Sequence, residues 1–292
     1  MREFIEVLIT GITIGIVYFL VAVGFTLCYG VGRVLNYSYG SFFTWGAYLA
    51  WVLAVGYSKL NYVLVFVIVL PIMFFLGVAV DQVLIRPLRK RPEFDFSVIL
   101  VTLGLAVFLD NLVLVIFGAR TKSLPEFLTG SVKLGGFTIS WQLIAMFIFA
   151  LVVAVVLFVF MARTRTGMSM RAVAQDPTGA RIVGIPLFRV FAVTFGISTL
   201  LCGAGGILLA PRFFMTPTGG WTFLVKALII VIAGGLGSLR GTLYASFMLG
   251  IIEAIVGWKL GLLWVMPFWF LVLFLVLLVK PAGLFGATAR KG

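Results

Sequence analysis

The sequence contains no histidine and only two cysteines, and it has 9 Asp and Glu against 22 Lys and Arg. Cys28 and Cys202 both lie inside apolar runs, where a free cysteine is usually a small packing residue. These absences exclude a metal centre built from histidine and cysteine. We therefore expect no metal and no cofactor in this chain. Since the acids are also not clustered, we expect no catalytic residues.

The chain also lacks a Walker A motif, because GxxxxGK[ST] occurs nowhere in it. Its most glycine-rich stretch, Gly234–Gly241 (GGLGSLRG), follows an apolar helix rather than a strand. This context favours close packing of helices over phosphate binding, with Arg240 as a cytoplasmic anchor.

What the chain has in abundance is apolar sequence, since 63% of its residues are hydrophobic and 11% are charged. Several runs reach the roughly 20 residues that span a bilayer. The sequence predicts an all-α polytopic membrane protein, one domain over residues 1–292, with about eight or nine membrane segments. The candidate runs are Phe4–Gly30, Tyr37–Gly56, Leu60–Ile85, Phe96–Phe117, Ile139–Ala162, Phe188–Ala210, Trp221–Leu236, Thr242–Trp258 and Leu263–Val279. The second and seventh are short or glycine-rich, so either is predicted to be broken or re-entrant.

The net charge of +13 does not indicate nucleic acid, because the basic residues lie in short loops between apolar runs. If the loop Arg163–Arg189 is cytoplasmic, most Lys and Arg fall on the same side. With nine crossings the two termini then lie on opposite sides, the N-terminus outside. The longest outside loop, Gly118–Thr138, is predicted to be irregular.

In the stretch Gly24–Tyr48, four glycines (Gly30, Gly32, Gly40 and Gly46) break or thin the helix, and polar groups lie at or near membrane depth. Irregular backbone is tolerated there only inside protein or beside a wet cavity. A helix that begins near Gly40 would offer free N–H groups to a carboxylate. Its aromatic side chains would line an apolar pocket or, alternatively, serve helix packing and an interfacial belt. They are Tyr37, Tyr39, Phe42, Phe43, Trp45 and Tyr48.

Five ionisable residues lie within or near the apolar runs: Glu6, Asp81, Asp110, Lys226 and Glu253. Charges in a membrane are costly and indicate function by default. Asp110 and Glu253 lie deepest, so a secondary carrier coupled to protons or sodium is one alternative. Lys226 has a structural alternative, which is to pair with one of the acids.

The longest structured polar stretch is the loop Arg163–Arg189. We predict two short helices in it, separated at Asp176-Pro177 because proline disfavours helix in the residue before it. Thr178 is predicted to cap the second helix, and Gly184 to end it. The two alternatives are a segment that fits a groove on a partner protein and an amphipathic helix on the membrane surface.

Four stretches in order give the chain a specific likeness. They are Gly24–Tyr48, Arg163–Ile185 (RTRTGMSMRAVAQDPTGARIVGI), Thr194–Pro211 and Val231–Glu253 (containing GGLGS). Together they resemble the permease subunits of ATP-binding-cassette importers for branched-chain amino acids. The resemblance implies a multi-pass protein of the bacterial inner membrane. It also implies alternating access driven by two ATPase subunits, a second homologous permease subunit and delivery by an extracytoplasmic binding protein.

The resemblance also implies roles for particular residues. The substrate pathway would include Asn36, Tyr37, Tyr39, Gly40, Gly46, Tyr48, Gly235 and Gly237. The coupling helices that dock on the ATPase, over about 163–187, would include Arg171, Ala172, Ala174, Asp176, Gly179 and Gly184. Tyr39 stands where the family often has His or Ser, and the same permease type also serves urea and short amides. The substrate therefore stays open at this point.

Overall fold

The computed structural model describes residues 2–56, 60–134 and 137–286. Helices dominate, and their bounds follow the chain as α1 (Arg2–Gly32), α2 (Tyr39–Trp51), the π-helical turn η1 (Val52–Gly56), α3 (Tyr62–Val80), η2 (Asp81–Ile85), α4 (Arg86–Leu88), α5 (Phe94–Phe117), α6 (Trp141–Arg163), α7 (Arg165–Gln175), α8 (Pro177–Ile182), α9 (Leu187–Leu209), α10 (Gly220–Gly234), α11 (Leu239–Lys259), η3 (Leu262–Trp264) and α12 (Val265–Val279). Two short strands, β1 (Ser131–Leu134) and β2 (Phe137–Ser140), form an antiparallel pair.

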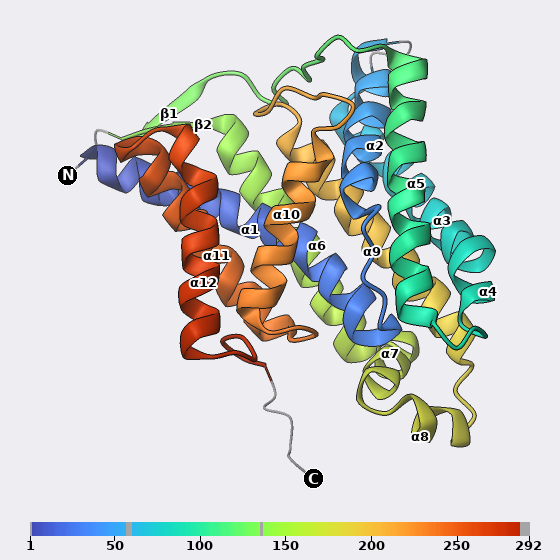
Figure 1. The fold of residues 1–292 in the computed structure, drawn as a ribbon. Helices are drawn as coiled ribbons and strands as arrows, with labels where there is room; N and C mark the ends of the chain where they lie inside the picture. The colour runs from blue at the N-terminus through green and yellow to red at the C-terminus, as the bar shows by residue number, and fades with distance from the viewer. Residues whose placement is uncertain (1, 57–59, 135–136, 287–292) are drawn as a thin grey trace.

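Every predicted apolar run coincides with a helix apart from a few residues at its ends, and the predicted fold class is confirmed. Within the described residues, 7 helices are long and apolar enough to cross a membrane. The second and seventh runs give the shorter helices α2 and α10, as their glycines indicate. Successive helices run up and down one bundle, and α1 crosses it obliquely from the end that carries the hairpin (Figure 1).

The centre of the bundle is formed by α1 and α9, whose side chains are mostly buried, while α12, α5 and α6 are mostly exposed. Small residues make the close contacts at the centre. For example, a Cβ added to Gly250 of α11 would lie 2.6 Å from the Cα of Gly15 in α1. Such backbone contact is how helices associate in lipid, where no hydrophobic force drives helix pairing. The exposed apolar side chains of the outer helices suit contact with lipid.

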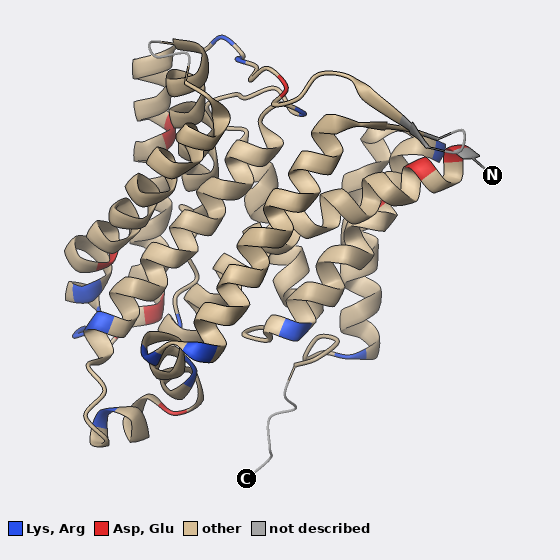
Figure 2. Ribbon diagram, turned by 180° about the vertical axis from the view of Figure 1, so that it is seen from behind, with Lys and Arg blue, Asp and Glu red and all other residues tan. Residues whose placement is uncertain are grey.

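Lys and Arg gather at the end of the bundle that carries α7, α8 and the last turn of α12 (Figure 2). The opposite end carries the start of α1 and the hairpin. The positive-inside rule therefore predicts that the first end is cytoplasmic and that the N-terminal residues of α1 lie outside. Arg290 and Lys291, which entered the predicted charge balance, lie outside the described residues.

The prediction of irregular structure for the whole of Gly118–Thr138 is wrong. Residues at its end pair as β1 and β2, with Val132 opposite Ile139. A second pairing joins Lys122 to Met215 of the loop before α10, where each backbone N–H donates to the other residue's carbonyl, at 3.0 and 2.8 Å. The sequence signal for the hairpin was Gly135-Gly136 between two short alternating runs.

Candidate functional site

The helical structure is interrupted between α1 and α2, inside the bundle. Arg33 has φ 54°, and residues 33–38 run without helix before α2 begins at Tyr39. The Asn36 Oδ1 accepts the backbone N–H of Ser38 at 3.0 Å and its hydroxyl at 2.6 Å. The Tyr37 N–H donates to the Thr102 Oγ1 of α5 at 3.2 Å. These protein partners are what allow irregular backbone at this depth.

Close contacts hold α2 against α9 and α10. A Cβ added to Gly40 would lie 2.5 Å from the carbonyl oxygen of Gly220, and one added to Gly46 would lie 2.5 Å from the Cα of Gly203. The Tyr39 hydroxyl, fully buried, donates to the Val21 carbonyl at 2.7 Å. The short helix is therefore fixed at its start by contacts that leave no room for side chains.

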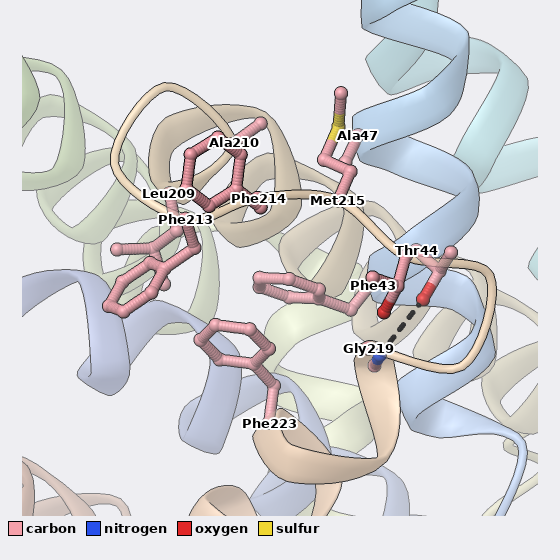
Figure 3. Close-up of a pocket in the computed structure, with 12 residues that line it drawn as sticks. Phe43, Thr44, Ala47, Leu209, Ala210, Phe213, Phe214, Met215, Gly219 and Phe223 are labelled. Atoms are coloured by element: carbon pink, nitrogen blue, oxygen red, sulfur yellow. Dashed lines mark hydrogen bonds between the residues drawn. The ribbon is translucent and has the colours of Figure 1, made fainter. Parts of the chain in front are cut away.

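Beside these contacts lies a small apolar pocket with a cavity volume of about 40 Å³. Its walls come from α2, the end of α9, the loop 210–219 and the start of α10 (Figure 3). Phe43 and Phe223 stack with ring centroids 4.0 Å apart, and Phe213 meets Phe223 edge-on at 5.6 Å. Its main polar feature is the Thr44 Oγ1, which accepts the Gly220 N–H at 3.1 Å. This chemistry suits an aliphatic group.

Sequence reasoning placed Phe43 in a possible apolar pocket but missed Phe213 and Phe223. Both rings line the pocket that contains Phe43. They lie about 170 residues away along the chain, and neither belongs to a motif. The remaining candidates of the first stretch, Asn36, Tyr37, Tyr39, Gly40, Gly46 and Tyr48, lie on the broken segment and on α2 next to the pocket. Their role in a substrate pathway stays a prediction.

Gly235 and Gly237 lie elsewhere, in the turn between α10 and α11 at the end where basic residues gather. Both have positive φ, 103° and 82°, which glycine adopts without steric cost. A Cβ added to Gly30 of α1 would lie 3.3 Å from the Cα of Gly237. The contacts in this turn agree with the packing interpretation of the glycine-rich stretch. The structure does not bring these two residues to the apolar pocket.

A buried ionic cluster joins four helices of the bundle. Lys226 of α10 donates to both carboxylate oxygens of Glu253 of α11, at 2.9 and 2.8 Å, and to the Tyr18 hydroxyl of α1 at 2.6 Å. Tyr18 in turn donates to Glu253 at 2.9 Å, and Trp269 of α12 packs edge-on against its ring. Lys226 thus pairs with an acid, as the structural alternative in the sequence analysis stated. Such a pair is costly to bury unless every charge is compensated, as it is here.

Asp110, the other deep acid, lies near the starts of α2 and α10. Its Oδ2 accepts the indole N–H of Trp221, in the first turn of α10, at 2.7 Å. The side chain is buried, with 6% of its surface exposed. A carboxylate near the positive end of a helix is favourable, because the backbone N–H groups of the first turn carry partial positive charge. The contact gives Asp110 a structural role between α5 and α10.

The predicted coupling segment forms two helices outside the bundle, α7 and α8, separated at Asp176-Pro177 as predicted. The cap of α8 differs from the prediction, since the Asp176 Oδ1 accepts the Thr178 N–H at 2.9 Å. Asp176 is the N-cap because its short side chain places a carboxylate oxygen within reach of the free N–H two residues further along the chain. Gly184, with φ 84°, ends the segment as predicted.

One face of this segment is anchored and the other is free of contacts within the described chain. Met170 and Val173 are buried against the bundle, and a Cβ on Gly167 would lie 2.6 Å from the Cα of Met161 in α6. Ile182 and Val183 are 81% and 76% exposed. Of the predicted coupling residues, Arg171, Asp176 and Gly184 are exposed, whereas Ala172, Ala174 and Gly179 are partly buried.

A buried arginine links this end of the bundle to the break after α1. Arg89, just after α4, donates to the carbonyl of Gly32, the last residue of α1, at 3.1 Å. Its guanidinium lies 3.7 Å from the ring centroid of Phe191 in the first turns of α9, and 3.9 Å from the Asp81 carboxylate. Burial lowers the pKa of Arg89, while the charge of Asp81 opposes that shift. The contacts run from the helix that follows α8 to the broken segment.

The sequence matches the family described as "Branched-chain amino acid transport system / permease component" over residues 7–280. The chain belongs to this permease family. It is 27% identical to the high-affinity branched-chain amino acid transport system permease protein BraD of Pseudomonas aeruginosa, with 97% of this chain and 96% of that protein covered. It is 28% identical, over the same shares, to the permease protein LivH of the corresponding system of Escherichia coli K12.

A solved structure, PsaBC from Streptococcus pneumoniae in complex with Fab, has a similar fold, with a TM-score of 0.54 over 97% of each chain. At 12% identity this likeness concerns the fold alone. Membership confirms the family resemblance given by the four ordered motifs. The permease family is one of transport components rather than enzymes, and this member is a multi-pass membrane protein.

Proposed function

We propose that this chain is the permease subunit of an ATP-binding-cassette importer in the bacterial inner membrane, one permease domain over its whole length. Its substrates are branched-chain or other apolar amino acids delivered by an extracytoplasmic binding protein. Its other partners are two ATPase subunits, a second homologous permease subunit and membrane lipid. The chain itself carries no cofactor, and ATP is bound by the partner subunits.

The observation that carries this proposal is the projecting pair α7 and α8. They bear exposed arginines and the exposed apolar residues Ile182 and Val183 at the basic end of the bundle. A single turn connects α8 to α9, which packs against α1, α2 and α3. An ATPase that binds α8 and moves would therefore displace α9, which packs at the centre of the bundle.

A series of contacts could transmit a displacement of α9 to the apolar pocket. Displacement of α9 would shift Phe191, on which Arg89 stacks, and Arg89 holds the end of α1. The broken segment follows directly, and then α2 with the apolar pocket. Alternating access requires two arrangements of such packed elements. In this proposal the ATPase shifts the equilibrium between the two arrangements. The pocket then opens to the opposite side of the membrane.

The apolar pocket supports the substrate class. Its aromatic and aliphatic walls suit an aliphatic side chain, because burying each CH₂ group contributes about 0.8 kcal/mol. Urea and short amides, which the same permease type also serves, would gain little from these walls. We therefore favour apolar amino acids over amides.

Two substitutions test the coupling assignment. Gly184→Pro cannot adopt the φ of 84° and removes the N–H that donates to the Arg181 carbonyl at 3.1 Å, so the turn after α8 is lost. Arg171→Glu reverses an exposed charge on α7. We expect each to lower uptake by about tenfold or more, since charged interface contacts contribute a few kcal/mol. Uptake of labelled leucine and co-purification of the ATPase would be measured in the same membranes.

The matched control for these variants is Arg120→Glu, an equally exposed arginine at the opposite end of the bundle. It should leave co-purification of the ATPase unchanged. All variants should remain in the membrane fraction at the level of the parent protein. Retention of both uptake and ATPase binding by Gly184→Pro would refute the coupling role.

The ion-coupled carrier makes a different prediction for Asp110→Asn. The asparagine carbonyl can still accept the Trp221 N–H, so only the charge is lost. We expect ATP-driven uptake within about fivefold of the parent protein. Uptake would be followed with and without a proton gradient. Complete loss of uptake by Asp110→Asn, together with uptake by the parent protein that depends on the proton gradient, would support the carrier instead.

A further inference from the structure

A second and larger cavity lies at the end of the bundle opposite α7 and α8. It has a volume of about 780 Å³ and lies between the first turns of α1, the loop after α9 and the end of α11. Its charged side chains are Glu3, Glu6, Arg212 and Glu253, from three separate parts of the chain. Nothing in the sequence motifs marked this combination.

The cavity presents both signs of charge and an apolar wall. Arg212 is exposed, whereas Glu253 is 7% exposed and held by Lys226 and Tyr18. Glu6 of α1 accepts the Thr138 N–H of the hairpin at 2.8 Å, and this hydrogen bond holds the hairpin beside α1. Phe213 and Phe214 contribute aromatic side chains to its apolar wall. Since charges of opposite sign line the space, a ligand that carries both is favoured over an ion of one sign.

We propose that this cavity is an entry subsite for α-amino acids as zwitterions, with the ammonium at Glu253, the carboxylate at Arg212 and the aliphatic side chain against Phe213 and Phe214. The proposal rests on the proposed function and adds the groups that recognise the substrate. Lys226 is the positioning residue, because its two hydrogen bonds fix the orientation of the Glu253 carboxylate. Tyr18 holds the same carboxylate from a second direction.

The entry subsite adjoins the apolar pocket of Figure 3. Phe213 and Phe214 line both spaces, so the loop that carries them is a shared wall. The Phe213 and Phe223 rings lie 5.9 and 5.8 Å from the Lys226 ammonium, between the ionic cluster and the pocket. A shift of this loop would let the side chain of a bound amino acid enter the pocket while its charged groups remain at the cluster.

Three ligands of one shape separate the recognition groups. L-leucine, 4-methylpentanoate, which lacks the ammonium, and 3-methylbutylamine, which lacks the carboxylate, would be titrated against the full-length chain in lipid nanodiscs. Intrinsic tryptophan fluorescence and calorimetry would report binding. We expect each truncated ligand to bind at least about tenfold more weakly than leucine, because it makes one charged contact fewer with the cavity.

Arg212→Gln identifies the carboxylate partner without disturbing the core, since Arg212 is exposed. We expect it to weaken leucine binding by about tenfold and to leave binding of 3-methylbutylamine unchanged. Arg120→Gln, an exposed arginine outside the cavity, is the control and should change neither. In the complete transporter, Arg212→Gln should also raise the half-saturation concentration of leucine in ATP-driven uptake, whereas Arg120→Gln should not.

The outcomes separate this inference from the proposed function. Equal affinity for leucine and 4-methylpentanoate, or leucine binding by Arg212→Gln at the affinity of the parent protein, would overturn the entry subsite while ATP-driven uptake stands. Binding of urea or acetamide in place of leucine would overturn it as well. Loss of ATP dependence with the ligand pattern intact would instead refute the proposed function alone.

Discussion

Replacement of Gly220 with valine is expected to separate α10 from α2 and to abolish uptake. A Cβ at this position would collide with the carbonyl oxygen of Gly40 and would lie 2.5 Å from the Thr44 Oγ1. The clash is with backbone, so it cannot be relieved by a side-chain rotation. Overpacking of this kind costs about 3 kcal/mol. It would also remove the hydrogen bond from Gly220 to Thr44, which closes one side of the apolar pocket.

The matched control is Gly104→Val on α5, where an added Cβ meets nothing within 4 Å. Both variants place a β-branched residue in a membrane helix, so the intrinsic helix cost is the same. Thermal unfolding in detergent and leucine uptake would be compared for the two. A Gly220→Val protein as stable and as active as Gly104→Val would mean that α2 and α10 do not touch as described.

The sequence predicts the helices of this protein well, because a bilayer demands about 20 apolar residues for each crossing whatever their order. The break near Asn36 and Gly40 was also predictable, since glycines and polar groups at membrane depth favour irregular backbone buried inside the protein. The coupling segment was divided correctly at Asp176-Pro177, although Asp176 rather than Thr178 provides the cap.

Pairing across the bundle was much less predictable. Lys226 and Glu253 lie on adjacent helices, and pairing of Lys226 with an acid was one alternative, but the identity of that acid could not be read from spacing. Phe213 lies in a loop, where no periodicity gives direction to a side chain. Helix packing in lipid depends on small residues that recur throughout the chain, so motifs alone do not say which glycine meets which.

Removal of the Lys226 charge is the second change for which we expect a large effect. Lys226→Met would leave the Glu253 carboxylate buried with the Tyr18 hydroxyl as its remaining hydrogen-bond donor among the described side chains. An uncompensated buried charge costs about 3–5 kcal/mol. We therefore expect a large loss of stability, measured as the free energy of unfolding in mixed micelles.

The double variant Lys226→Met/Glu253→Leu separates the stability of the ionic cluster from its function. It removes both charges, and replacement of a buried pair by apolar residues is often neutral, so most of the lost stability should return. If Glu253 receives the ammonium of the substrate, this folded protein should still fail to bind leucine. Equal stability of the single and double variants would show that the charges do not interact. Normal leucine binding by the stable double variant would remove Glu253 from the entry subsite and leave Lys226 and Glu253 as a structural pair between α10 and α11.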